Sequence, residues 1–213
     1  MKNSWTVWYQ NRRVERGKWK VEKGKELVDE YKPARIGISS CLLGENVRYD
    51  GGHKLDRLLR DTLGKYVDYV PVCPEVECGL GVPRESMHLA GDPEGPRLIT
   101  SQTGVDLTDR ITLWALNRVK ELESENLSGF IFKSRSPACG MERVEIFQEN
   151  GQAVGRGVGI FARIFMEYFP QIPVEEDGRQ HDPDLRENFI EAILPGRRLK
   201  IEPSTGSGQG IEN

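Results

Sequence analysis

The sequence contains few cysteines and histidines and no closely paired cysteine motif. Its 213 residues include four Cys and three His, and the two closest cysteines, Cys73 and Cys78, are separated by four residues. A zinc ribbon, which needs C-x2-C pairs, is therefore not expected. The cysteines are spread over about a hundred residues, unlike the dense disulfide framework of a small secreted domain.

Long apolar runs and an excess of positive charge are also absent. No apolar segment approaches the length of a membrane span, and the N-terminus lacks the apolar stretch of a signal peptide. Lys and Arg number 30 against 33 Asp and Glu, so no overall positive field attracts nucleic acid. We therefore expect a cytoplasmic protein with no membrane partner; its oligomeric state is not determined by the sequence.

The charge divides the chain into parts. Residues 1–32 contain nine Lys or Arg, five Asp or Glu, and three of the four tryptophans. They are expected to form a charged extension, and the acids among its bases favour a solvated segment over a nucleic-acid-binding arm. The folded domain is expected over 33–195. The polar, glycine-rich residues 196–213 are expected to be a disordered tail.

Short apolar runs typical of buried strands alternate with segments of helical spacing. This order predicts an α/β fold: a single Rossmann-like domain with a mostly parallel sheet and helices between the strands. Residues 74–96, rich in Pro and Gly, are expected to be a long loop that carries part of the site. The expected strands are 34–40, 67–72 and 128–137, and the expected helices are 53–65, 106–126, 157–169 and 182–194.

Three of the cysteines follow the predicted strands. Cys41, Cys73 and Cys139 each lie within a few residues of a strand's end, whereas Cys78 lies five residues further into the long loop. The carboxyl ends of parallel strands share one edge of a sheet, so these three side chains are expected to meet there. Buried inert thiols, a nucleophile, or ligands to a soft metal are all compatible with this pattern.

Thiolates that converge in this way suit an iron–sulfur cluster or zinc. Four protein ligands would complete a closed electron-transfer cluster. Three would leave one iron of a cubane open, and an open iron is a Lewis acid able to bind a soft substrate atom such as sulfur.

Three sequence blocks carry a resemblance to a known family. In order along the chain, ISSCLLGENVRYDGGHK, VPVCPEVECGLGVPRE and FKSRSPACGMERV are similar to the signature blocks of the DUF523 family. Its characterised members are thiouracil desulfidases, and the resemblance covers about residues 33–175. The segment VEEDGRQHDPDLRENF also resembles the end of this domain in members fused to a DUF1722 domain, some of which remove sulfur from 4-thiouridine in tRNA. That second domain is not expected in this chain.

The resemblance implies a [4Fe–4S] cluster held by Cys41, Cys73 and Cys139, with Cys78 outside the ligand set. The open iron would bind the sulfur of a thiolated pyrimidine, namely 2- or 4-thiouracil or 4-thiouridine. Hydrolysis of the C–S bond would then give uracil or uridine and sulfide, with no net redox change.

The family's acid/base residues correspond to Glu75 of CPE and Ser136 of SRSP. Tyr49, Asp50 and Ser134 are candidates for contacting the substrate. From the residues alone, Glu75 could instead cap a helix or pair with Arg84, and Ser136 could be an ordinary turn residue.

Two other functions are compatible with the sequence. One is a non-catalytic metal-binding or redox module, in which all four cysteines hold a closed cluster or zinc. The other is a tRNA-binding 4-thiouridine demodification module that uses residues 1–32 to hold the RNA. The sequence does not decide between a free base, a nucleoside and a thiolated tRNA, or between C2 and C4 thiolation. It also leaves open whether Cys78 is an inert neighbour, a sulfur-relay thiol or an occasional fourth ligand that blocks the open iron.

Overall fold

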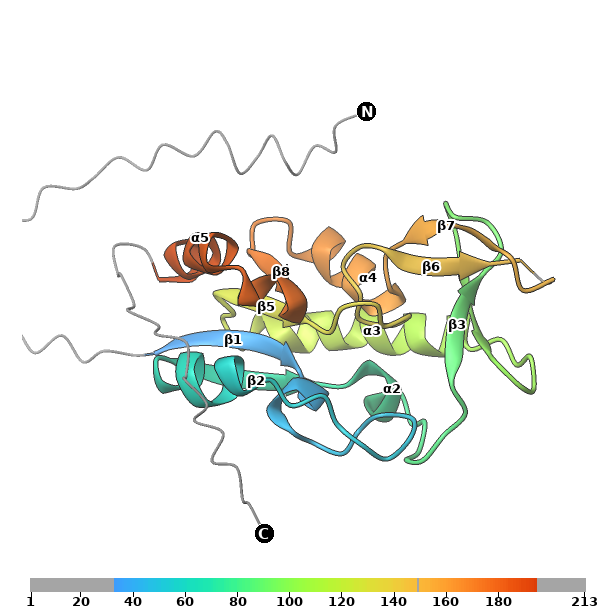
Figure 1. The fold of residues 1–213 in the computed structure, drawn as a ribbon, viewed down its shortest axis with the longest axis horizontal. Helices are drawn as coiled ribbons and strands as arrows, with labels where there is room; N and C mark the ends of the chain where they lie inside the picture. The colour runs from blue at the N-terminus through green and yellow to red at the C-terminus, as the bar shows by residue number, and fades with distance from the viewer. Residues whose placement is uncertain (1–32, 149, 195–213) are drawn as a thin grey trace, which may run out of the picture. The chain divides into compact units, whose positions relative to one another are not determined.

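The fold is built on a four-stranded parallel sheet (sheet A). The computed structural model describes residues 33–148 and 150–194, so the predicted extension 1–32 and tail 196–213 lie outside the described residues. Every neighbouring pair in sheet A is parallel, and the predicted α/β architecture is confirmed (Figure 1). In spatial order the strands are β2 (Val67–Val72), β1 (Ala34–Ser39), β5 (Gly129–Phe132) and β8 (Val174–Glu176).

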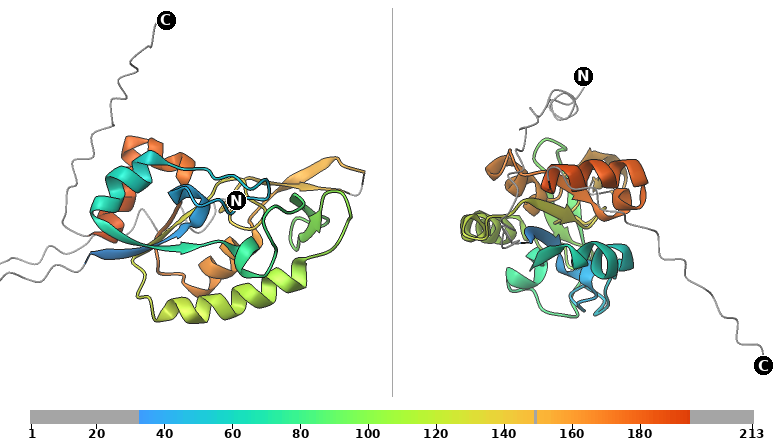
Figure 2. Two further views of the ribbon diagram at one scale, coloured as in Figure 1. Left: turned by 90° about the horizontal axis from the view of Figure 1, so that it is seen from below. Right: turned by 90° about the vertical axis from the view of Figure 1, so that its left-hand side faces the viewer.

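Helices cover both faces of sheet A, because its strands are apolar on both sides. Successive side chains of a strand point to opposite faces, so Phe130 and Phe132 belong to one core cluster and Ile131 to the other. The first cluster packs against α3 (Thr108–Glu123) and α4 (Ile160–Tyr168), the second against η2 (Leu58–Thr62) and α5 (Pro183–Ile193). Figure 2 shows these two helical layers on either side of the sheet.

Gly37 in the middle of β1 allows the closest packing within the first cluster. A Cβ placed there would lie 2.2 Å from a ring carbon of Phe130, a distance that real Cβ atoms do not reach. The Phe130 ring also stacks on Phe132, with centroids 4.3 Å apart, and lies 4.7 Å from the ring of Phe165. Because Gly37 has no side chain, the ring of Phe130 can pack directly against the sheet at this position.

A second four-stranded sheet (sheet B) was not predicted. Its central strands pair in parallel and its outer pairs are antiparallel. The segment 74–96 is accordingly not one loop, because it contains α2 (Pro74–Glu77) and a strand of this sheet as well as irregular stretches. In spatial order the strands are β4 (Arg97–Thr100), β3 (Met87–Ala90), β6 (Val144–Phe147) and β7 (Ala153–Gly157).

Other boundaries differ from the sequence expectation. The helix predicted over 53–65 is a π-helical turn, η2, followed by the 3-10 turn η3 (Leu63–Lys65). The third strand ends at Phe132 rather than at 137, which leaves 133–143 as a loop. Two further 3-10 turns, η1 (Ser40–Leu43) and η4 (Asp177–His181), directly follow β1 and β8.

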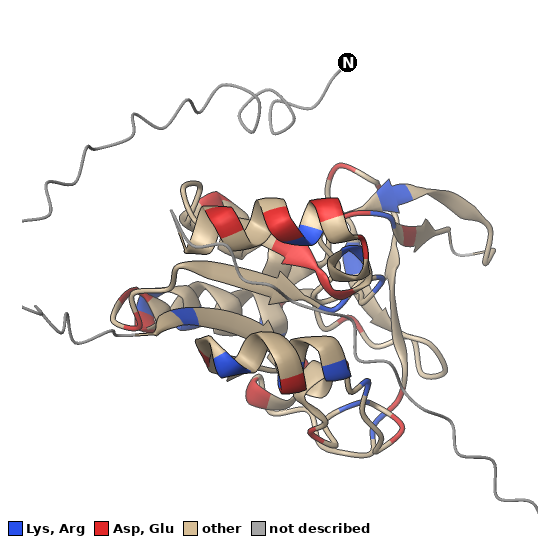
Figure 3. Cartoon of the chain, turned by 60° about the vertical axis from the view of Figure 1, so that its left-hand side comes forward, with Lys and Arg blue, Asp and Glu red and all other residues tan. Residues whose placement is uncertain are grey.

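Charged residues of both signs occur along η2 and α5 (Figure 3), whose buried residues belong to the second core cluster. The helix α5 begins at an N-cap, where the Asp182 carboxylate accepts hydrogen bonds from the backbone N–H groups of Asp184 and Leu185.

None of the helices in the described part of the chain has both the length and the apolar character that a membrane span requires.

Candidate functional site

A cavity of about 440 Å³ lies at the carboxyl edge of sheet A, and Cys41, Cys73 and Cys139 all line it. Cys41 lies in η1 after β1, and Cys73 lies between β2 and α2. Cys139 lies in the loop that follows β5. The structure therefore brings together the three cysteines that were expected to meet. Among the described residues, no three Cys, His, Asp or Glu side chains are grouped so as to hold a single metal ion.

The three thiols share one electrostatic environment. Burial raises the pKa of Cys41 to about 12 and that of Cys73 to about 11, from an ordinary value of 9.0. Burial also raises the pKa of Cys139 well above that value, and the nearby Cys73 sulfur adds to the effect at both Cys41 and Cys139. Without a bound cation the three groups keep their protons. A soft metal centre that bound them would displace those protons.

The charged residues that line this cavity are mainly basic, a feature that the sequence analysis missed. Positive groups of this kind balance the charge of thiolates or of an anionic ligand. Among the described lining residues, the single carboxylate is that of Glu75. The basic residues are Arg48, Lys54, Arg84, Lys133 and Arg135.

Glu75 lies in α2, two residues after Cys73, and forms a part-buried ion pair with Arg84. The Arg84 Nε donates to Glu75 Oε2 at 2.9 Å, and a terminal nitrogen also bonds Oε2. The same terminal nitrogen donates to the Val47 carbonyl at 2.8 Å, and the other donates to the Gly81 carbonyl at 3.0 Å. Among the described residues Glu75 Oε1 has no hydrogen-bond partner. The ion pair considered from the sequence therefore exists, and it orients a carboxylate in the cavity wall.

Ser136 also lines the cavity and shapes the loop that carries Cys139. Its Oγ accepts the backbone N–H groups of Ala138 at 3.2 Å and Cys139 at 3.1 Å. These two bonds use the oxygen's acceptor capacity and leave the hydroxyl hydrogen as a donor. Arg135, the preceding residue, has a left-handed φ of 59°. Ser136 thus stabilises the turn before Cys139 and also lines the cavity.

Ser134 belongs to a polar network that includes an unpredicted acid, Asp177. The Ser134 backbone N–H donates to Asp177 Oδ1 at 2.7 Å, and Lys133 Nζ donates to Asp177 Oδ2 at 2.8 Å. Asp177 follows β8 directly. Its place at the strand end is the signal that could have identified it, but a three-residue strand gives no clear periodicity.

The two residues proposed from the first loop differ in position. Tyr49 lines the cavity, is 41% exposed, and has the Arg48 guanidinium 5.2 Å from its ring centroid. Asp50 is not among the lining residues. Its carboxylate accepts the Gly52 N–H at 3.0 Å, the largest cause of its lowered pKa, and an Arg48 hydrogen bond at 3.4 Å. Asp50 therefore stabilises the turn of its own loop.

Cys78 also lies outside the cavity lining. Its thiol donates to the Glu75 carbonyl at 3.3 Å, and it packs against the first core cluster. Burial raises its pKa as well. The structure thus divides the four cysteines into three that line the cavity and one that does not.

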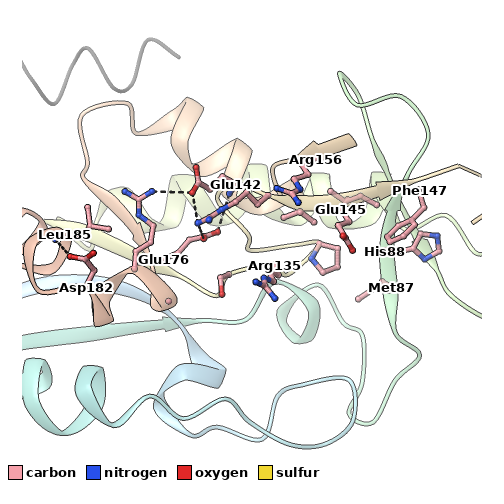
Figure 4. Close-up of a pocket in the computed structure, with 17 residues that line it drawn as sticks. Met87, His88, Arg135, Glu142, Glu145, Phe147, Arg156, Glu176, Asp182 and Leu185 are labelled. Atoms are coloured by element: carbon pink, nitrogen blue, oxygen red, sulfur yellow. Dashed lines mark hydrogen bonds and ion pairs between the residues drawn. The ribbon is translucent and has the colours of Figure 1, made fainter. Parts of the chain in front are cut away.

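A larger cavity of about 790 Å³ adjoins the first and shares with it Met87, Ser134, Arg135 and Pro137 (Figure 4). Several of its charged groups are paired with one another, as in the contacts of Glu142 with Arg143 at 2.9 Å and with Arg179 at 3.3 Å. In the part of the chain that the structure describes, Arg135 and Arg156 have no ion-pair partner. Arg135 therefore brings an uncompensated charge to the junction of the two cavities.

Comparisons with known proteins agree with this geometry. Residues 36–177 match the family described as 2-thiouracil desulfurase. The uncharacterized protein YbbK of Bacillus subtilis (strain 168) is 31% identical over 143 residues, which cover 62% of this chain and 89% of YbbK. A solved structure described as the [4Fe-4S]-dependent thiouracil desulfidase TudS is similar with a TM-score of 0.56. It is 27% identical in sequence, and the match covers 72% of this chain and 95% of that chain.

Proposed function

The chain belongs to the 2-thiouracil desulfurase family, and from this premise we propose that it removes sulfur from a thiolated pyrimidine by an iron–sulfur-dependent reaction. The observation that carries the proposal is the shared cavity of Cys41, Cys73, Cys139 and Glu75. The reaction replaces the sulfur of a C=S group by the oxygen of water. Its products are the C=O compound and hydrogen sulfide, so no oxidant or reductant is consumed.

A [4Fe–4S] cluster fits the donor set of this cavity, and the similar TudS structure is described as dependent on such a cluster. Three soft thiols reach the cavity from segments that follow three different strands, and the basic residues of the lining balance the charge of their thiolates. Cys41, Cys73 and Cys139 would hold the cluster. When bound with three protein ligands, it would supply a Lewis-acidic iron with affinity for the substrate's sulfur.

Glu75 is the general base of the proposed reaction. Arg84 holds its Oε2, so Oε1 is the atom that accepts a proton from the water adding to the ring carbon. Without this proton transfer, the attacking water would develop positive charge as its oxygen bonds to carbon.

Ser136 is the hydrogen-bond donor of the proposed reaction. Its oxygen already accepts two backbone N–H groups, so its hydroxyl hydrogen can point to a ring nitrogen or to the developing negative charge. Tyr49, on the exposed side of the same cavity, would contact the pyrimidine ring. Ser134 lines both cavities, and its Oγ already accepts a hydrogen bond from Lys133, so its proposed contact is a weaker one.

The size of the second cavity favours a substrate that extends beyond the ring, such as 4-thiouridine. It meets the first cavity at 134–137, and the guanidinium groups of Arg135 and Arg156 face it without ion-pair partners among the described residues. The position of Cys78 outside the lining argues against a closed four-cysteine centre.

The test is an anaerobic assay of the reconstituted full chain with 2-thiouracil, 4-thiouracil, 4-thiouridine and thiolated tRNA, with sulfide measured over time. We expect sulfide release that depends on bound iron, with a larger kcat/KM for 4-thiouridine than for 4-thiouracil. Bound iron without sulfide release from any of the four would favour the redox module. Release from tRNA alone would favour the demodification function.

A further inference from the structure

Lys133, the residue directly after β5, presents a fixed positive charge to the cysteine cavity. Its Nζ donates to Asp177 Oδ2 at 2.8 Å, to Ser134 Oγ at 2.9 Å and to the Ser134 carbonyl at 3.2 Å. An ammonium group has three N–H donors, and all three are used here. The Lys133 ammonium therefore has no free N–H to donate to a substrate, and its three hydrogen bonds fix its position.

Asp177 completes this arrangement from the end of β8. Its side chain is 15% exposed, and its second oxygen accepts the Ser134 N–H at 2.7 Å. Burial raises the pKa of Asp177, but the hydrogen bonds from Lys133 and Ser134 outweigh this effect, and the net pKa is lowered. The carboxylate is therefore ionised in the folded chain at neutral pH.

Backbone contacts place Lys133 beside the cysteines. Its N–H donates to Ser39 Oγ at 2.9 Å, which joins the end of β5 to the end of β1, two residues before Cys41. Lys133 lines the same cavity as Cys41, Cys73 and Cys139. Its charge therefore acts on the group that these three cysteines hold.

We propose that Lys133 is a positioning residue whose anchored charge stabilises negative charge on the group held by Cys41, Cys73 and Cys139. This inference rests on the proposed function, because it concerns the cluster of that function. Two other cations of the lining are engaged differently: Arg84 pairs with Glu75, and Arg48 lies over Tyr49 and bonds Asp50. Lys133 joins the loop of Cys139 to the strand end of β1 and to Asp177 directly after β8.

The experiment compares the wild-type full chain with Lys133→Met, Lys133→Arg, Asp177→Asn and Lys120→Met after anaerobic reconstitution. Lys120 is an exposed residue of α3, and its substitution removes the same charge outside the cavity. Iron and sulfide per chain are counted first. The midpoint potential of the cluster is then measured by a spectroscopic titration with a chemical reductant.

We expect Lys133→Met to shift the potential to a more negative value, because reduction adds a negative charge that Lys133 stabilises. Lys133→Arg and Lys120→Met should stay at the wild-type potential. Asp177→Asn should shift it to a more positive value, because a carboxylate is removed while Ser134 still holds the ammonium. If Lys133 and Asp177 only maintained the structure of the site, Lys133→Met and Asp177→Asn would shift the midpoint potential in the same direction.

Two failures are distinguishable. If the wild-type chain takes up no cluster, the proposed function and this inference are both wrong. If it takes up a cluster and Lys133→Met has the wild-type potential, or Lys133→Arg shifts as far as Lys133→Met, the inference alone is overturned. A shift of the same sign in Lys133→Met and Asp177→Asn overturns it as well.

Discussion

The guanidinium of Arg84 bonds one oxygen of the Glu75 carboxylate through two of its nitrogens, with Nε 2.9 Å from Oε2. Both side chains are largely buried, at 8% and 16% exposure, in the wall that contains Cys73. Because the other guanidinium bonds go to backbone carbonyls, the carboxylate is held relative to the main chain.

The first prediction concerns Glu75→Gln. This variant should keep the cluster but lose at least about 100-fold in the rate of sulfide release, since general bases typically contribute that much or more. Iron content and the cluster's visible absorption check loading, and sulfide release checks activity. Glu167→Gln makes the same change at an exposed position of α4 and should resemble the wild type. An unchanged rate in Glu75→Gln would remove Glu75 from the catalytic role.

Arg84→Lys should lower kcat about tenfold, because a lysine keeps the charge but lacks the planar fork that fixes Oε2. The same substitution in a Glu75→Gln background should have little further effect if Arg84 acts through Glu75. The measurement is a double-mutant cycle on sulfide release. Equal effects in the two backgrounds would show that Arg84 acts independently of Glu75.

Single substitutions of the cysteines should separate the three that line the cavity from the fourth. Cys41→Ser, Cys73→Ser and Cys139→Ser should each lower the iron bound per chain, because each removes a soft ligand. Cys78→Ser is the matched control and should retain wild-type iron content. Iron retained without Cys41 but lost without Cys78 would contradict the three-ligand assignment.

The metal-free chain should lose stability as the pH rises from about 9 toward 11. An unfolded thiol ionises near 9.0, whereas the folded Cys73 and Cys41 keep their protons until about 11 and about 12. The unfolded state therefore releases protons first, and alkaline pH favours it. The check is denaturant unfolding at several pH values. Cys41→Ala combined with Cys73→Ala should flatten the profile, and an equally steep fall in that variant would assign the effect to other groups.

Gly37→Ala should lower the free energy of unfolding by about 1–3 kcal/mol, because the added methyl group would overlap the ring of Phe130. Gly95→Ala is the control, since nothing lies within 4 Å of a Cβ added there. Its effect should remain within about 0.5 kcal/mol. Urea unfolding of both variants measures the difference, and equal stabilities would mean that the aromatic group repacks without cost.

The sequence by itself determined the strands of the site and the cysteines that follow them. Residues 67–72 were predicted as a strand with the bounds that β2 has, because a short apolar run before Cys73 is a local signal. The parallel order predicted that Cys41, Cys73 and Cys139 would meet, since parallel strands end at a shared edge. Cys139 lies seven residues beyond the end of β5, so the loop 133–143 also determines its place. The family motifs then supplied Glu75 and Ser136, whose roles stay predictions.

Only the tertiary structure decided what surrounds those residues. Sheet B depends on pairing Leu89 of β3 with Ile146 of β6, and no local pattern encodes a contact between such distant, short segments. Asp177 reaches Lys133 across 44 residues, and the same folding leaves Asp50 outside the cavity. Periodicity specifies which segments form strands, whereas the partners of a charged side chain depend on how those strands are brought together.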